Sequence, residues 1–150
     1  MDNIVITIAR HFGSGGKTIG YMLSEDLGIK CYEHEIIKMA SEDSGINETL
    51  FNQADERLKH TPMFLNRLKG EYKGNLISPD SEQFVSDHNL FNYQAKIIRD
   101  LADRESCIII GRAADYVLKD YPNRVSVFVH ASKAYCIEQA VARHACIGDP

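Results

Sequence analysis

The chain has 150 residues, of which 44% are hydrophobic and 25% are charged, a composition typical of a soluble globular protein with one domain. Its formal net charge of −4 gives no general reason to bind nucleic acid or an anionic membrane surface. No apolar run approaches the roughly 20 residues that span a bilayer, and the four cysteines form no C-x-x-C pair, so we expect a cytoplasmic protein with reduced cysteines.

The first predicted elements are a strand at Asn3–Ala9 and a helix at Lys17–Leu27, joined by a glycine-rich segment. The strand is apolar at nearly every position, as expected for burial on both faces of a sheet. The segment between them ends in Gly16-Lys17-Thr18. A strand, a glycine loop, Lys-Thr and a helix in that order are typical of a phosphate-binding P-loop, although His11 stands where the full pattern has its first glycine.

The chemistry of phosphate binding explains this pattern. Glycines let the backbone approach the ligand, so that successive N–H groups converge on an anion next to the helix N-terminus. Lys17 would add a mobile positive charge, and Thr18 a hydroxyl for Mg²⁺. For Arg10 and His11, phosphate contact and loop packing both remain open. The predicted ATP phosphate-binding residues are Gly13, Ser14, Gly15, Gly16, Lys17 and Thr18, with Thr18 reaching Mg²⁺ through the nucleotide.

A short strand at Ile29–Tyr32 is predicted next, followed by an almost wholly helical insert at about 33–79. Ile46 and Phe51 occupy the two positions of a hydrophobic staple at a helix start. An insert at this place could cover a bound substrate. Within it we predict helices over Glu33–Ser44, from the N-cap Asn47 to about Leu58, and over 61–69, and then a loop at 70–79.

The second half of the chain continues the alternation of helices and strands. We predict a long helix from Ser81 to about Asp103, a strand at Cys107–Ile110, a loop or helix at Arg112–Leu118, a strand at Val125–Val129 and a helix from Ser132 to about Ala145. This order implies an α/β fold with a parallel sheet, whose ligands bind beyond the carboxyl ends of the strands. The segments 10–18, 32–35 and 111–115 are therefore candidate walls of one site.

Four segments together resemble the cytidylate kinase-like proteins, which are P-loop nucleoside monophosphate kinases. These segments are ITIARHFGSGGKTIG, CYEHEIIKMASEDSGI, IIIGRAADYVL and VSVFVHAS, and the resemblance covers essentially the whole chain. It implies a P-loop NTPase fold, with a three-layer parallel sheet and a helical substrate-binding insert in one domain over residues 1–150. It also implies transfer of the γ-phosphoryl group of ATP to a nucleoside monophosphate, with CMP or dCMP first, and with Mg²⁺.

The resemblance also carries residue roles onto this sequence. Arg112 matches the arginine that holds the substrate phosphate in the family, so Lys17 and Arg112 are the expected catalytic residues. Tyr32 and Glu33 lie where the insert meets the acceptor nucleotide, and Asp115 lies near the matched arginine. The implied substrate-binding set is Tyr32, Glu33, Arg112 and Asp115, and the implied partners are small-molecule nucleotides.

The sequence departs from the family pattern at three positions. Ala113 stands where cytidylate kinases have an aspartate, and Cys136 and Gln139 stand where arginines are expected. The family's lid and last strand should follow position 150, so we expect the chain to lack both. These departures leave two alternatives open, a nucleotide-binding module without catalysis and a P-loop kinase for another small acceptor. The oligomeric state is left open as well.

Overall fold

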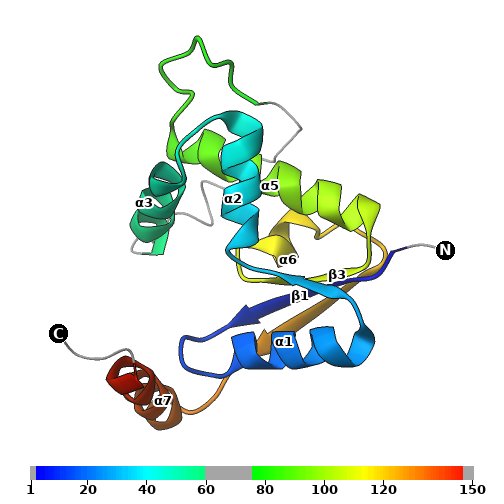
Figure 1. The fold of residues 1–150 in the computed structure, drawn as a ribbon, viewed down its shortest axis with the longest axis vertical. Helices are drawn as coiled ribbons and strands as arrows, with labels where there is room; N and C mark the ends of the chain where they lie inside the picture. Colours follow the sequence, from blue (N-terminus) through cyan, green and yellow to red (C-terminus); the bar gives the residue numbers. More distant parts are fainter. Residues whose placement is uncertain (1–2, 60–75, 147–150) are drawn as a thin grey trace. The chain divides into compact units, whose positions relative to one another are not determined.

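A computed structural model describes residues 3–59 and 76–146, without the side chains of residues 56–59 and 144–146. In this part of the chain no helix combines the length and the apolarity needed to cross a membrane. The elements, drawn in Figure 1, are β1 (Val5–Arg10), α1 (Gly16–Leu27), β2 (Lys30–Tyr32), α2 (Glu35–Ser44), α3 (Glu48–Lys59), α5 (Asp87–Arg104), β3 (Cys107–Ile110), α6 (Ala114–Val117), β4 (Arg124–Val129) and α7 (Lys133–Cys146).

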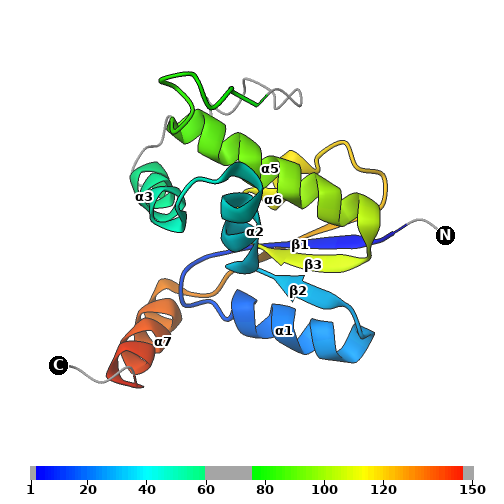
Figure 2. The same ribbon diagram turned by 45° about the horizontal axis from the view of Figure 1, so that its top comes forward.

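The four strands form one parallel sheet in the order β2-β3-β1-β4, which confirms the predicted α/β architecture. In the register of the sheet, Ile8 of β1 lies opposite Ile110 of β3 and Val127 of β4. All four strands therefore end at the same edge, and the segments that follow β1, β2 and β3 meet there. Figures 1 and 2 show α1 on one side of the sheet and α6 on the other.

The core of the sheet consists of aliphatic side chains from neighbouring strands. Ile8, Ile108 and Ile110 are buried in one cluster, against which Leu23 of α1 packs. All four residues of β3 are fully buried, which explains why its sequence is continuously apolar rather than alternating. This rigid base fixes the loops at the carboxyl edge.

The chain divides into two units, which are described separately. The sheet unit comprises Met1–Glu33 and Leu101–Pro150, and the helical unit comprises His34–Asp100. The insert predicted at about 33–79 falls almost wholly in the helical unit, which also contains most of α5.

The entry into α3 follows the predicted capping pattern. The side-chain oxygen of Asn47 accepts a hydrogen bond of 2.8 Å from the backbone N–H of Thr49. Ile46 and Phe51, the two staple residues, are both buried. The local sequence therefore specified the start of this helix, as capping residues commonly do.

The long helix begins later than predicted. The prediction placed its start at Ser81, whereas α5 begins at Asp87 and residues 79–85 form turns. The buried side chain of Asn89 explains the difference, because its oxygen accepts a bond of 3.0 Å from Ile77 N–H while its amide donates to the Phe84 carbonyl at 2.7 Å. These bonds hold the segment in a non-helical path. The helix predicted over 61–69 lies outside the described residues, as does most of the loop predicted at 70–79.

Candidate functional site

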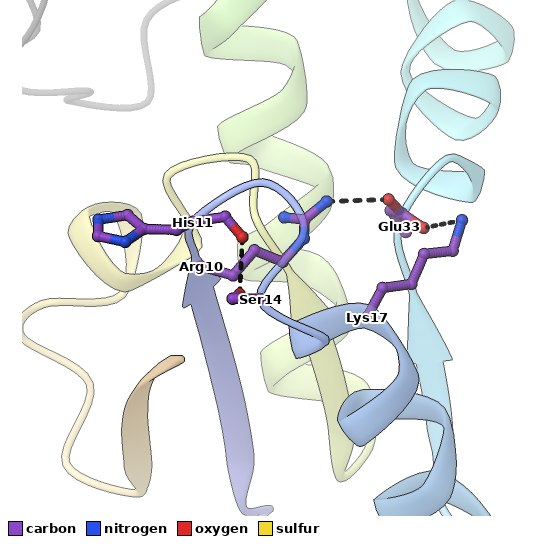
Figure 3. A network of polar contacts seen from close by, with 5 residues as sticks. All are labelled: Arg10, His11, Ser14, Lys17 and Glu33. Carbon is purple, nitrogen blue, oxygen red and sulfur yellow. Dashed lines mark hydrogen bonds and ion pairs between the residues drawn. The ribbon is translucent and has the colours of Figure 1, made fainter. Parts of the chain in front are cut away.

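The glycine loop between β1 and α1 has the backbone of an anion-binding turn. Gly13 and Gly15 adopt left-handed conformations, with φ of 80° and 91°, and Gly15 is the N-cap of α1. The carbonyl of His11 accepts hydrogen bonds from Ser14 through its backbone N–H (3.1 Å) and its hydroxyl (2.6 Å), as Figure 3 shows for the hydroxyl. Because Gly15 has no side-chain acceptor, the first N–H groups of α1 stay available to an anion.

Lys17 and Thr18 lie in the first turn of α1, immediately after this loop. Lys17 is partly exposed, and its ammonium lies 2.9 Å from Oε2 of Glu33. Thr18 is exposed, so its hydroxyl can be reached from solvent. Ser14, in contrast, is buried, and its hydroxyl holds the turn together through His11.

Glu33 occupies the centre of the polar network at this edge (Figure 3). The prediction placed Glu33 at the start of a helix, but α2 begins at Glu35, which leaves Glu33 in the turn after β2. Its side chain is only 8% exposed, and Oε1 accepts a hydrogen bond of 3.2 Å from Nη2 of Arg10. The carboxylate thus bridges Arg10 and Lys17, and pairing of this kind is what permits a buried charge.

Arg112 lies in a segment of unusual backbone conformation after β3. Gly111, Arg112 and Ala113 have φ of 67°, 60° and 52°, three consecutive residues in the left-handed region. A left-handed non-glycine residue costs about 1–3 kcal/mol and persists only where the surroundings impose it. Asp115 follows in the first turn of α6, and its backbone carbonyl accepts a bond of 2.6 Å from Arg124. Such strain is common at ligand sites, which is consistent with the predicted role of Arg112.

Arg10 connects these segments, and the sequence had left its role open. A Cβ built on Gly111 would lie 2.8 Å from Nη1 of Arg10, and one built on Gly16 would lie 2.7 Å from the Arg10 Cβ. The side chain therefore runs past the start of α1 to the end of β3 and on to Glu33 after β2. His11 packs its ring edge-on against Phe128 of β4, with centroids 5.1 Å apart.

Tyr32 has a different position from the other predicted acceptor residues. Its hydroxyl donates a short hydrogen bond to Oε1 of Glu105, which precedes β3. In a parallel sheet the residues before β3 lie at the amino edge, so this hydroxyl points away from the glycine loop. Burial, and then this hydrogen bond, raise the pKa of Tyr32 from 10.0 to about 12. A contact between Tyr32 and the acceptor therefore receives no support from the hydroxyl.

The raised pKa gives a testable dependence on pH. Because the folded protein favours the neutral phenol, Tyr32 contributes stability below pH 10, and this contribution is lost as the pH rises through about 12. In an ultraviolet titration of phenolate formation, Tyr32→Phe should remove the latest component. Tyr135→Phe, at an exposed tyrosine, should leave that component in place. A late component that persists in Tyr32→Phe would contradict the assignment.

The residues present fit a Mg²⁺ ion that is held mainly by phosphates. Among residues 3–59 and 76–146, no group of three or more His, Cys, Asp or Glu side chains could hold a metal by itself. Mg²⁺ commonly binds through one or two protein ligands, waters and nucleotide phosphates, and the exposed Thr18 hydroxyl beside the left-handed glycines suits that arrangement.

The chain is similar to known proteins in sequence and in structure. Residues 5–149 match the sequence model described as the cytidylate kinase-like family. Among solved structures, an uncharacterized protein from Eubacterium ventriosum is 24% identical with a TM-score of 0.58, over 95% of this chain and 63% of that one. A gluconokinase from Sinorhizobium meliloti is 18% identical with a TM-score of 0.49, over 95% of this chain and 66% of that one. The chain thus spans less than two-thirds of either protein's length. A search of the curated proteins found no match.

Proposed function

Because the chain belongs to the cytidylate kinase-like family, we propose that it transfers the γ-phosphoryl group of ATP to a nucleoside monophosphate, with CMP or dCMP as the first candidates. The observation that carries the proposal is the meeting of three segments at one edge of the sheet. These are the glycine loop with Lys17, the turn with Glu33 and the left-handed segment with Arg112. Phosphoryl transfer asks a protein mainly for such alignment of donors and charges.

In the proposed reaction, the N–H groups of the glycine loop and of the first turn of α1 bind the ATP phosphates. Lys17 neutralises charge on the outer phosphates. Thr18 would hold Mg²⁺, which stabilises the negative charge that develops during transfer. Arg112 grips the acceptor phosphate with two parallel N–H donors. The attacking phosphate oxygen is already an anion, so the reaction needs no general base.

A coupled spectrophotometric assay of ADP release tests the proposal with a panel of nucleoside monophosphates. We expect turnover with one monophosphate and little ADP release without an acceptor. Protein that binds ATP, judged by calorimetry, but turns over no monophosphate would contradict the proposal and favour a nucleotide-binding module. Turnover of another small acceptor added to the same assay, but of no monophosphate, would favour a P-loop kinase of another specificity.

A further inference from the structure

We propose that Arg10 is a positioning residue of the phosphate site, which acts through Glu33 on the ammonium of Lys17. The inference rests on the proposed function in so far as Lys17 binds phosphate, and it goes beyond that function by giving Arg10 and Gly16 roles. It does not make Arg10 a ligand of the nucleotide.

The path of Arg10 crosses three neighbouring strands. Arg10 is the last residue of β1, Gly111 follows β3 and Glu33 follows β2, and these strands lie side by side in the order β2-β3-β1. Nη1 of Arg10 approaches Gly111, and Nη2 donates to Glu33 at 3.2 Å. A guanidinium has a planar fork that can serve two such neighbours at once, which a lysine ammonium does not.

Gly16 is matched to Arg10. Its conformation is helical rather than left-handed, so the backbone does not demand a glycine there. A Cβ at this position would lie 2.7 Å and 2.9 Å from the Cβ and Cδ of Arg10, which belong to the stem of the side chain and not to its mobile end. The stem of the Arg10 side chain, which runs past the start of α1, therefore explains why residue 16 has no side chain.

The balance of charge shows how Arg10 acts on Lys17. Glu33 is nearly buried, with Oε1 on Arg10 and Oε2 2.9 Å from Lys17. Arg10 shares the carboxylate with Lys17, so Glu33 attracts the ammonium less strongly than it would if Arg10 were absent. Without Arg10, the carboxylate would hold Lys17 more tightly and oppose an incoming phosphate. Arg10 thus holds Glu33 in place and leaves the ammonium free to exchange the carboxylate for a phosphate oxygen.

Binding of inorganic tripolyphosphate, measured by calorimetry, tests this role independently of catalysis. We expect Arg10→Met to weaken binding about tenfold and Glu33→Gln to bind as tightly as the parent or more tightly. The double variant Arg10→Met/Glu33→Gln should return to within about threefold of the parent, because the loss of one positive charge is then offset by the loss of one negative charge. Arg104→Met, at a 61% exposed arginine on the amino side of β3, is the control for loss of one charge and should bind like the parent.

Thermal unfolding tests the packing of Arg10 without any ligand. Gly16→Ala should lower the Tm of the parent by several degrees, because the new methyl overlaps Arg10. In an Arg10→Gly background, which also removes the Cβ of residue 10, the same change should raise the Tm, because alanine is favoured over glycine in a helix. A drop in both backgrounds would overturn the inferred path of Arg10.

The outcomes separate this inference from the proposed function. If the double variant binds tripolyphosphate as weakly as Arg10→Met, Arg10 contacts phosphate directly and the positioning role is wrong. If the parent binds tripolyphosphate and Arg10→Met binds equally well, the role is also wrong, while the phosphate site and the proposed function stand. If the parent does not bind, the phosphate site itself fails, and with it the action on Lys17; the thermal measurement then still decides the path of Arg10.

Discussion

Lys17→Met is expected to lower kcat of the proposed phosphotransfer by about 100- to 1000-fold. Lys17 is the cation in the first turn of α1, next to the loop whose N–H groups converge on the phosphates. Removing one preorganised donor from a site where charge develops typically costs that much in rate. The substitution should alter kcat more than the KM for the acceptor, because Arg112 remains to bind the acceptor. Steady-state kinetics with the acceptor identified by the panel measure both values.

Lys30→Met is the matched control for this variant. Lys30 is an exposed lysine at the start of β2, at the amino edge of the sheet, whereas Lys17 lies at the carboxyl edge. The control should retain kcat within about twofold of the parent. A Lys17→Met protein that keeps its kcat within threefold, while folded by circular dichroism, would show that Lys17 does not serve the transferred phosphate.

Gly13→Ala is expected to destabilise the protein by about 2–5 kcal/mol, through backbone strain and overpacking together. Gly13 has a φ of 80°, which L-residues rarely adopt. A Cβ there would also overlap the backbone carbonyl of Cys136 in α7, and its distance to the carbonyl carbon would be only 3.0 Å. A backbone carbonyl within a helix cannot rotate away, so the loop or α7 must move. Urea denaturation measures the loss, and tripolyphosphate binding should weaken with it.

Gly28→Ala separates the two causes. Gly28 is also left-handed, with a φ of 67°, but a Cβ there would meet nothing within 4 Å. Gly28→Ala should therefore lower the free energy of unfolding only by the strain of the left-handed conformation, about 1–2 kcal/mol. Equal losses in the two variants would mean that α7 does not pack against the loop as described.

The parts of the fold that depend on local sequence could be predicted. Buried strands such as Cys107–Ile110 have continuously apolar sequences, and Asn47 specified its helix by its own side chain. The predicted start of the long helix was wrong, because the side chain of Asn89 binds the backbone at Phe84 and Ile77. A single buried amide that reaches back along the chain leaves no periodic signal.

The candidate site was predictable as a set of loops but not as a network. The glycine loop and the Gly-Arg pair after β3 are sequence motifs, whereas the path of Arg10 depends on β3 lying between β1 and β2. Strand order is a property of the folded chain, so the meeting of Arg10 with Glu33 could not be read from spacing.

The left-handed run at Gly111, Arg112 and Ala113 has a consequence for protein engineering. Substitutions that suit the φ of position 113 better than alanine, such as glycine or asparagine, would relieve strain and raise thermal tolerance. The same relief would loosen the backbone that fixes the direction of Arg112. Selection for function would therefore favour alanine at position 113, whereas a screen for thermal stability would favour glycine or asparagine. Such a conflict is expected where a strained loop serves function at the expense of stability.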